Sequence, residues 1–333
     1  MSGFRIGTRG SALATTQTGH VAEALRRAGA GEAQTIIVKT EGDVVTGSLA
    51  SLGGTGVFAA ALRQRVLDGE VDVAVHSLKD LPVLQPEGLS IAAIPARVDV
   101  RDVLVARDGL TLDTLPTGSV VGTGSPRRAA QLLAARPDLK VKDIRGNVPT
   151  RLRRVKGLEL EHDDSASVGR EHAGDLDAVI LAGAGLDRLG LERFITERID
   201  PMVMLPAPGQ GALAVEVATG TLARDDEFTR ALASLDDDAT RLAVTAERAL
   251  LNRLEGGCAA PLGALGLPGR AGFLRLDAVA VSPDGSRMLR RSLGGEVLFE
   301  ADAVGLGHAL ADELLGLGAA GLMGTGPAEG GAK

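Results

Sequence analysis

The stretch 71–82, Val-Asp-Val-Ala-Val-His-Ser-Leu-Lys-Asp-Leu-Pro, constrains the fold more than any other part of the chain. Val71, Val73 and Val75 recur at every second position, which predicts a mostly buried strand. Four polar residues follow before a proline: His76, Ser77, Lys79 and Asp80. Open α/β sheets bind ligands beyond the carboxyl ends of their strands, so this cluster is a candidate site. A solvated surface turn is the alternative that the stretch alone leaves open.

Strands and helices alternate over the first two thirds of the chain, which predicts an α/β protein. The expected strands lie at 4–7, 35–39, 71–75, 89–94, 103–106, 119–122, 141–144, 177–181 and 212–217, and the expected helices include 12–27 and 58–67. The chain has no Trp, no Tyr and only six Phe, so its cores must be built from Val, Leu, Ile and Ala. At 333 residues it exceeds the usual size of a single core.

The order of these elements predicts three domains. A chain that leaves the first lobe near residue 100 and returns near residue 203 makes two crossovers, which favours a hinge. Strands at 259–265, 273–281 and 288–293, with helices at 241–254 and 301–317, predict a small third domain. The expected domains are 1–100 with 203–218, then 101–202 and 222–322, followed by a disordered tail at 323–333.

Arginines lie where strands give way to helices. Arg9 stands at a strand end just before Ser11, a good N-cap, and the start of a helix favours bound anions. Ser125 and Pro126 form a strong helix start, yet Arg127 and Arg128 in its first turn oppose the helix dipole. We therefore expect these two arginines to face an anionic ligand. Ordinary surface arginines are the alternative.

A second basic cluster follows the strand expected at 141–144. It contains Arg145 and a predicted helix with Arg151, Arg153 and Arg154. Arginine binds a carboxylate through two parallel hydrogen bonds, which lysine cannot do. Several arginines in an otherwise acidic chain indicate a ligand with several carboxylates.

Charge and composition exclude some functions. The formal net charge of −7 and the lack of Trp and Tyr argue against nucleic-acid binding. No apolar run reaches membrane-spanning length and the N-terminus lacks the apolar core of a signal peptide, so a cytoplasmic protein is expected. The single cysteine argues against a disulfide and a cysteine-based metal site. No metal is expected, because His162 and His172 fit solvated positions in a 157–174 loop.

Two glycine-rich stretches complete the candidate features. The stretch 42–56 has no helical or strand period and no P-loop signature, so it predicts a mobile lid. Cys258 follows Gly256 and Gly257, which indicates an accessible turn where a thiolate could act as a nucleophile. An inert core cysteine is the alternative.

Six motifs in order resemble those of the porphobilinogen deaminase family, also called hydroxymethylbilane synthases, and cover nearly the whole chain. They are Thr-Arg-Gly-Ser at 8–11, Asp-Val-Ala-Val-His-Ser-Leu-Lys-Asp-Leu-Pro at 72–82, Gly-Ser-Pro-Arg-Arg at 124–128, Ile-Arg-Gly-Asn at 144–147, Leu-Pro-Ala-Pro-Gly-Gln-Gly at 205–211 and Glu-Gly-Gly-Cys at 255–258.

The resemblance implies two α/β lobes like those of periplasmic binding proteins, with hinge crossovers, and a small α+β third domain that carries the cysteine. It implies a transferase of haem biosynthesis that joins four porphobilinogen molecules head to tail, with loss of ammonia, into hydroxymethylbilane. A dipyrromethane cofactor, held by Cys258 through a thioether, would prime the growing polypyrrole chain. The family also suggests a monomer, while the net charge and the lack of a membrane-spanning run argue against nucleic-acid and membrane partners.

The resemblance also implies site residues, with Asp80 as the catalytic carboxylate. The implied cofactor-binding residues are Cys258, Ser77, Lys79, Asp80, Ser125, Arg127, Arg128 and Gly146. The implied substrate-binding residues are Arg9, Ser11, Phe58, Arg145, Arg151 and Arg188. The glycine-rich stretch departs from the family, because Thr55 and Ser51 stand where many members have lysines.

Three other functions are weighed against this one. A non-catalytic, two-lobed protein that binds small anions would explain the hinge and the arginines, but not the third domain or the cysteine. A ligand-sensing regulatory domain would need an effector unit, and none is evident in the sequence. A cysteine hydrolase would need a base near Cys258, and no recognisable pattern supplies one.

Overall fold

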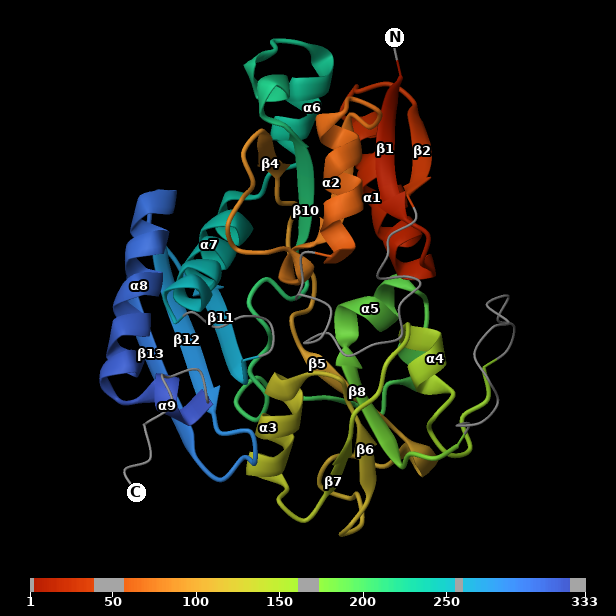
Figure 1. Cartoon of the computed structure of the whole chain (residues 1–333), viewed down its shortest axis with the longest axis vertical. Coiled ribbons are helices and arrows are strands. Elements are labelled where there is room, and N and C mark those ends of the chain that lie inside the picture. Colours follow the sequence, from red (N-terminus) through yellow and green to blue (C-terminus); the bar gives the residue numbers. More distant parts are fainter. Residues whose placement is uncertain (1–2, 39–56, 161–173, 255–259, 324–333) are drawn as a thin grey trace, which may run out of the picture.

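The computed structural model describes residues 3–38, 57–160, 174–254 and 260–323, and it contains two lobes beside a smaller third unit (Figure 1). Lobe 1 is built on a sheet of strand order β2-β1-β3-β10-β4. Its elements are β1 (Phe4–Arg9), α1 (Ala12–Arg27), β2 (Ala33–Val38), α2 (Val57–Leu67), β3 (Val73–Ser77), β4 (Leu89–Ala93), β10 (Leu213–Ala218) and α6 (Glu227–Ser234). The strand β1 is parallel to β2 and β3, whereas β10 is antiparallel to β3 and β4.

Lobe 2 is built on a sheet of strand order β7-β6-β8-β5-β9. Its elements are β5 (Asp102–Ala106), β6 (Val120–Gly122), α3 (Pro126–Ala135), β7 (Lys140–Lys142), α4 (Val148–Leu152), β8 (Ala178–Ala182), α5 (Gly183–Arg188) and β9 (Glu197–Arg198). The strand β6 is parallel to β7 and β8, whereas β5 is antiparallel to β8 and β9. Each lobe is therefore a mixed sheet with helices packed against it.

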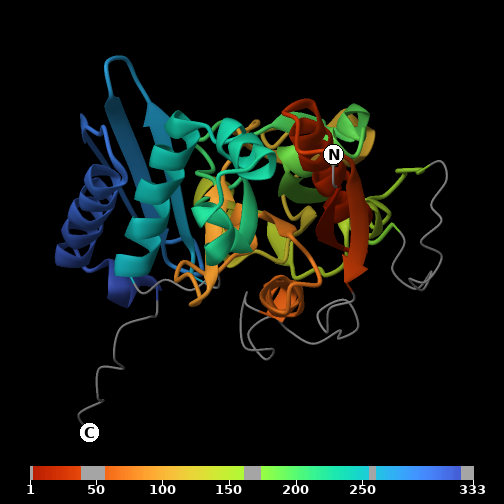
Figure 2. The same cartoon turned by 90° about the horizontal axis from the view of Figure 1, so that it is seen from above.

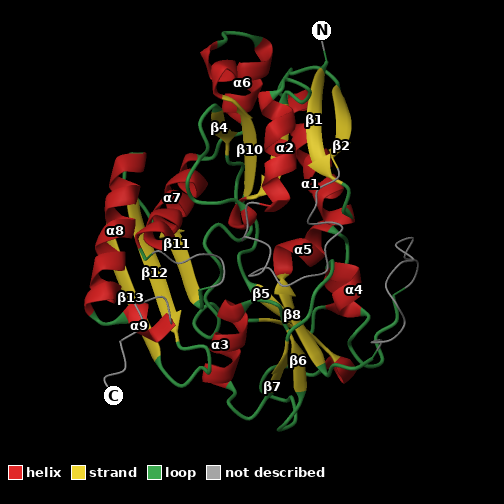
Figure 3. Cartoon of the chain, viewed as in Figure 1, coloured by secondary structure: helices red, strands yellow, loops and turns green. Residues whose placement is uncertain are grey.

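The third unit is an antiparallel sheet covered by helices, and it lies beside both lobes (Figure 2). Its strands are β11 (Leu262–Pro268), β12 (Phe273–Val281) and β13 (Met288–Glu296), and its helices are α7 (Asp238–Arg253), α8 (Glu300–Gly316) and α9 (Ala319–Met323). Helices α7 and α8 pack against each other and against the sheet (Figure 3). The predicted fold class, two α/β lobes with a small α+β unit, is confirmed.

The cores contain the small aliphatic side chains that the composition predicts. In lobe 2, Val103, Leu104 and Val105 of β5 are fully buried, because both faces of this strand are covered. In lobe 1, Phe4 is the aromatic side chain of the core, and its ring lies 5.2 Å from that of Phe228 in α6. Helix α6 was not predicted, although Asp226 and Thr229 form a capping box at its start.

The basic helix predicted beyond residue 147 is wrong in its extent. Helix α4 ends at Leu152, so Arg153 and Arg154 lie outside it. The carbonyl oxygens of both residues instead accept hydrogen bonds from the returning chain, Arg153 from Gly174 at 3.2 Å and Arg154 from Leu176 at 2.9 Å. These long-range bonds replace the local bonds that would continue the helix. The strand predicted at 141–144 likewise ends early, at Lys142.

Among the described residues, no helix combines the length and apolar character needed to cross a membrane.

Candidate active site

The carboxyl ends of β1 and β3 lie at the same edge of the lobe 1 sheet, because the two strands are parallel. Arg9 ends β1 and is half-buried, and Ser77 ends β3. The 3-10 turn η2 (Leu78–Asp80) follows β3 directly and leaves the side chain of Asp80 exposed. A pocket of about 90 Å³ is lined by residues that include Arg9, Ser11, His76, Ser77 and Asp80. The structure thus brings together five residues named from the sequence.

Ser11 and Ser77 are held by neighbours on α1. The Ser11 hydroxyl accepts a hydrogen bond from the backbone N–H of Ala14 at 3.3 Å, as an N-cap does. The amide of Gln17 donates to the Ser77 hydroxyl at 3.0 Å, and Gln17 is buried. Gln17 was not singled out from the sequence, where its only signal is a polar residue within an apolar helix face.

His76 belongs to β3, and the structure gives it an internal partner. Its Nε2 lies 3.1 Å from Oε2 of Glu216 on β10, and both side chains are buried. Arg63 of α2 donates to the same carboxylate at 2.9 Å. Burial raises the pKa of Glu216, but the hydrogen bonds from His76 and Arg63 outweigh burial and lower that pKa to about 2. His76 itself lines the pocket, so this network of Arg63, His76 and Glu216 forms part of the pocket wall.

Arginines gather at the corresponding edge of the lobe 2 sheet, where β6, β7 and β8 end and the following helices begin. Ser125 caps α3 by accepting a hydrogen bond from the N–H of Arg128 at 3.5 Å. The residues placed at this edge are Ser125, Arg127, Arg128, Arg145, Gly146, Arg151 and Arg188. The segments predicted as separate strand-to-helix junctions therefore share one side of the lobe.

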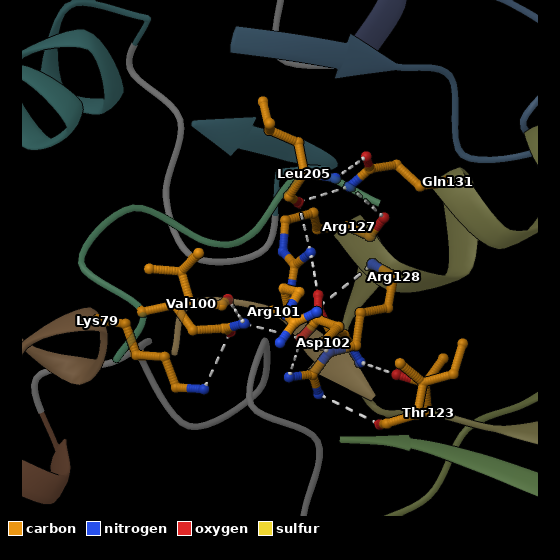
Figure 4. Close-up of polar contacts among 12 residues, drawn as sticks. Lys79, Val100, Arg101, Asp102, Thr123, Arg127, Arg128, Gln131 and Leu205 are labelled. Atoms are coloured by element: carbon orange, nitrogen blue, oxygen red, sulfur yellow. Dashed lines mark hydrogen bonds and ion pairs between the residues drawn. The ribbon is translucent and has the colours of Figure 1, made fainter. Parts of the chain in front are cut away.

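Arg127 and Arg128 share an internal carboxylate, Asp102 at the start of β5 (Figure 4). Nη1 of Arg127 lies 2.7 Å from Oδ2 of Asp102, and Nε of Arg128 lies 2.9 Å from Oδ1. All three side chains are buried. Burial raises the pKa of Asp102, but the two guanidinium groups reverse this and hold it well below its usual range. Asp102 was missed in the sequence, where it is a single acidic residue before an apolar strand.

Gln210 connects this cluster to lobe 1. Its Nε2 donates to Asp102 Oδ1 at 2.9 Å and to the Val100 carbonyl at 2.8 Å, while its Oε1 accepts from Lys79 Nζ at 3.3 Å. Burial and the charge of Arg128 lower the pKa of Lys79 to about 8, and Asp80 and Asp102 act in the opposite direction. Gln210 belongs to a sequence motif, but its role as a bridge between lobes was not predicted.

The remaining arginines lie nearer the solvent. Arg151 donates to the Gly146 carbonyl at 2.8 Å, and Gly146 has a φ of +103°, which glycine adopts readily. Arg188 donates to the Gly211 carbonyl at 2.9 Å, and burial lowers its pKa. Burial, followed by the charges of Arg128 and Arg145, lowers the pKa of Arg151 to about 10.

Charges from both lobes act on one another across the site. The groups that influence the pKa of Arg151 include Asp80 of lobe 1, and those that influence Lys79 include Arg127 and Arg128 of lobe 2. The exposed carboxylate of Asp80 therefore interacts electrostatically with Lys79 of lobe 1 and with Arg151 of lobe 2. Nε of Arg127 is buried and has no hydrogen-bond partner among the described residues. A donor set with this excess of positive charge fits a ligand that carries several carboxylates.

Some predicted features lie outside the described residues. They are Cys258, the glycine-rich stretch 42–56, and both His162 and His172. Phe58 belongs to α2, but its side chain is not among those described. Within the described part of the chain, no group of three His, Cys, Asp or Glu residues could hold a metal ion.

Comparison with known families gives two matches that together span most of the chain. Residues 4–226 match the family model described as porphobilinogen deaminase, dipyromethane cofactor binding domain. Residues 241–316 match the model of the porphobilinogen deaminase C-terminal domain.

Curated relatives agree with the family models. A porphobilinogen deaminase of Micrococcus luteus is 60% identical over 337 aligned positions, which cover 95% of this chain and 88% of the relative. One of Cutibacterium acnes is 54% identical, with 96% of each chain covered. Among solved structures, a periplasmic substrate-binding protein from Coxiella burnetii has a TM-score of 0.41 and 14% identity, with 71% of this chain and 93% of that chain covered.

Proposed function

The chain belongs to the porphobilinogen deaminase family, and we propose that Asp80 is the carboxylate on which its catalysis depends. The enzyme is a transferase that joins four porphobilinogen molecules into the linear hydroxymethylbilane and releases ammonia. When bound, its dipyrromethane cofactor supplies the pyrrole end to which new units are joined. One observation carries the proposal: the exposed carboxylate of Asp80 stands beside a pocket and within the field of cations from both lobes.

Asp80 can act on the substrate in two ways. Departure of ammonia from the aminomethyl group leaves positive charge on the porphobilinogen pyrrole, and a nearby carboxylate stabilises that charge. A carboxylate can also accept a hydrogen bond from the pyrrole N–H and exchange protons during the reaction. The turn η2 presents Asp80 to solvent, while Leu78 and Leu81 on either side of it are buried.

The cations hold the carboxylates that flank each pyrrole. Acetate and propionate groups pair with guanidinium groups through two hydrogen bonds. In this proposal Cys258 holds the cofactor through a thioether. The other residues that bind the cofactor are Ser77, Lys79, Asp80, Ser125, Arg127, Arg128 and Gly146. The residues that bind the incoming substrate are Arg9, Ser11, Phe58, Arg145, Arg151 and Arg188. The buried, unpaired Nε of Arg127 supports a further acceptor there, because a buried donor without a partner costs free energy.

Replacement of Asp80 by Asn tests the catalytic role. The amide keeps the size of the side chain but removes its charge, so we expect a folded protein whose kcat falls by about 10²-fold or more. Consumption of porphobilinogen and release of ammonia measure kcat, and circular dichroism measures folding. Asp225→Asn is the matched control, because the Asp225 side chain is 95% exposed and forms a surface ion pair with Arg230. Near-normal turnover of Asp80→Asn would exclude the assigned role.

The intact mass of the purified protein tests the cofactor assignment. Cys258 is the single cysteine of the chain, so Cys258→Ser removes the one thiol that can form the thioether. We expect the unmodified chain to carry the added mass of two linked pyrrole units and the variant to carry none. An equal excess of mass in both proteins would place the cofactor elsewhere. A bare chain that gains no mass on incubation with porphobilinogen would favour the anion-binding alternative.

We further propose that the enzyme works in the cytoplasm as a monomer, without nucleic-acid or membrane partners. The net charge of −7 supports the lack of nucleic-acid and membrane partners, because a negative protein is repelled by phosphate backbones and anionic lipid surfaces. Light scattering during size-exclusion chromatography measures the oligomeric state directly, and a mass twice that of the chain would contradict the monomer.

A further inference from the structure

The turn that carries Asp80 has little stability of its own. The 3-10 turn η2 is three residues long and is closed by the N–H of Leu81, which donates to the Leu78 carbonyl at 3.1 Å. Short 3-10 segments have strained hydrogen bonds and depend on their surroundings. The position of the Asp80 side chain must therefore be set by the elements packed around η2.

Arg248 of α7 binds the backbone of this turn. Its Nη2 donates to the carbonyls of Pro82 at 2.7 Å and Val83 at 3.1 Å. Its Nη1 donates to the carbonyls of Leu81 at 3.3 Å and Leu78 at 3.4 Å. One planar guanidinium group thus ties together four carbonyl groups on both sides of the turn, which a smaller donor could not span.

Apolar packing strengthens the same contact. Val244 lies one helical turn before Arg248 on α7 and belongs to a buried cluster with Leu78 and Leu81. The relative exposure of Leu78 is 0% and that of Leu81 is 2%. The face of α7 formed by Val244 and Arg248 therefore holds the two residues that flank Lys79 and Asp80.

The neighbouring residue of α7 supports the turn from a second direction. Glu247 is buried and accepts a hydrogen bond from the N–H of Gly209 at 2.6 Å. Gly209 has a φ of +73°, and a Cβ atom there would lie 3.2 Å from Cγ of Leu78 and 3.3 Å from the backbone nitrogen of Lys79. Gly209 is thus packed directly on η2. Helix α7 therefore contacts the turn directly through Arg248 and indirectly through Glu247, which binds Gly209.

We propose that Arg248 is a positioning residue for catalysis, which acts by holding the segment 78–83 so that Asp80 faces the bound substrate. The proposal rests on the catalytic role proposed for Asp80. Arg248 belongs to the third unit of the fold and Asp80 to lobe 1. The position of Asp80 therefore depends on how the third unit is packed against lobe 1. In the sequence, α7 also leads directly to the stretch that contains Cys258.

Arg248→Met tests the proposal, because methionine retains the length of the side chain and removes its donors. We expect kcat to fall at least tenfold while KM for porphobilinogen stays within about twofold, since the residues assigned to the incoming substrate lie outside the segment 78–83 that Arg248 holds. Amide hydrogen exchange of residues 78–83 is expected to accelerate. Arg253→Met is the matched control, because Arg253 lies on the same helix, is half exposed and pairs with Asp312; its kcat is expected to be unchanged.

A double mutant separates positioning from general stability. If Arg248 acts through Asp80, Arg248→Met should lower the residual turnover of Asp80→Asn by less than twofold. An undiminished tenfold loss in that background, or a normal kcat in folded Arg248→Met, would overturn the proposal. If Arg248→Met does not fold, Arg248→Lys takes its place, since one ammonium group cannot span four carbonyls, and full activity of that variant has the same meaning. Normal turnover of Asp80→Asn alone would instead overturn the proposed function.

Discussion

Lys79 shows how one side chain in the site is tuned by its surroundings. It follows a buried strand, and burial together with the charge of Arg128 lowers its pKa to about 8. Its ammonium group is therefore present below pH 8 and is lost as the pH rises through that value, well before a solvated lysine would deprotonate. A group with this behaviour makes carboxylate binding sensitive to pH in the mildly alkaline range.

The kcat for porphobilinogen turnover is expected to fall between pH 7 and pH 9, because Lys79 loses the charge that holds the carboxylates of the cofactor and of the growing chain. Steady-state kinetics across this range measures the effect. In Lys79→Arg the charge persists at pH 9, so kcat is expected to remain flat. Identical pH profiles for the two proteins would show that another group titrates.

At the level of residues, the sequence was sufficient to predict site residues where polar side chains follow strands or begin helices. Arg9, Ser11, Ser77 and Asp80 were each named from their place at a strand end or helix start, and they line one pocket. Asp102 and Gln210 could not be named in this way. Their partners lie far away in the sequence, with Gln210 and Asp102 separated by 108 positions, and only the folded lobes bring them together.

Elements of lobe 1 are joined by the network of Arg63, His76 and Glu216, which connects α2, β3 and β10. The Glu216 side chain is fully buried, its charge is balanced by Arg63, and His76 adds a hydrogen bond to the same carboxylate. Removal of one partner from a buried ion pair leaves the other charge without compensation. The network therefore fixes β10 against β3 at the strand that leads into the site.

Glu216→Gln is expected to lower the free energy of unfolding by about 3 kcal/mol or more at pH 7, because Arg63 then lacks a counter-charge. The pKa of Glu216 is lowered from 4.5 to about 2, so its contribution is complete above pH 4.5 and is lost as the pH falls toward 2. The difference in free energy of unfolding between the unmodified protein and Glu216→Gln should therefore narrow as the pH falls from 4.5 toward 2. Urea unfolding at each pH measures this difference. Glu70→Gln, at a half-exposed ion pair, should change stability by less than about 1 kcal/mol.

Periodicity predicted the central elements well and the short ones poorly. Strand β8, and β5 after Asp102, are continuous apolar runs that predict strands from the sequence alone. Helix α4 is five residues long, and its end is set by hydrogen bonds to the segment Gly174–Leu176, which no local pattern in the sequence reveals. Local propensity decides long elements, and tertiary contacts decide where short ones stop.

Across the whole molecule, the third unit contacts both lobes. Arg248 binds the Asp80 turn of lobe 1, while the tip of the hairpin between β12 and β13 packs on α3 of lobe 2. At that tip Gly285 has a φ of +74°, and a Cβ atom there would lie 2.5 Å from the backbone nitrogen of Ala134. We retain as a proposal the division into domains at 1–100 with 203–218, 101–202 and 222–322.

Gly285→Ala is expected to separate the hairpin from α3. The added methyl group meets backbone atoms that cannot rotate away, and its positive φ adds strain, so we expect a loss of roughly 2–4 kcal/mol in the free energy of unfolding. Gly29→Ala is the matched control, because Gly29 has a φ of +94° and no atom within 4 Å of the Cβ position. Thermal unfolding should separate the two variants by several degrees; equal losses would mean that the hairpin contact contributes nothing.

The place of β10 between β3 and β4 has a consequence for biosynthesis. A ribosome delivers β1 to β4 early, but the strand that joins β3 to β4 emerges only after all of lobe 2 has been made. Until then the edges of β3 and β4 have no strand between them and can pair with other chains. Lobe 2, which is continuous in sequence, can close its sheet first. The nascent protein therefore finishes folding from its middle outward, and its N-terminal sheet is the part that most needs a chaperone during translation.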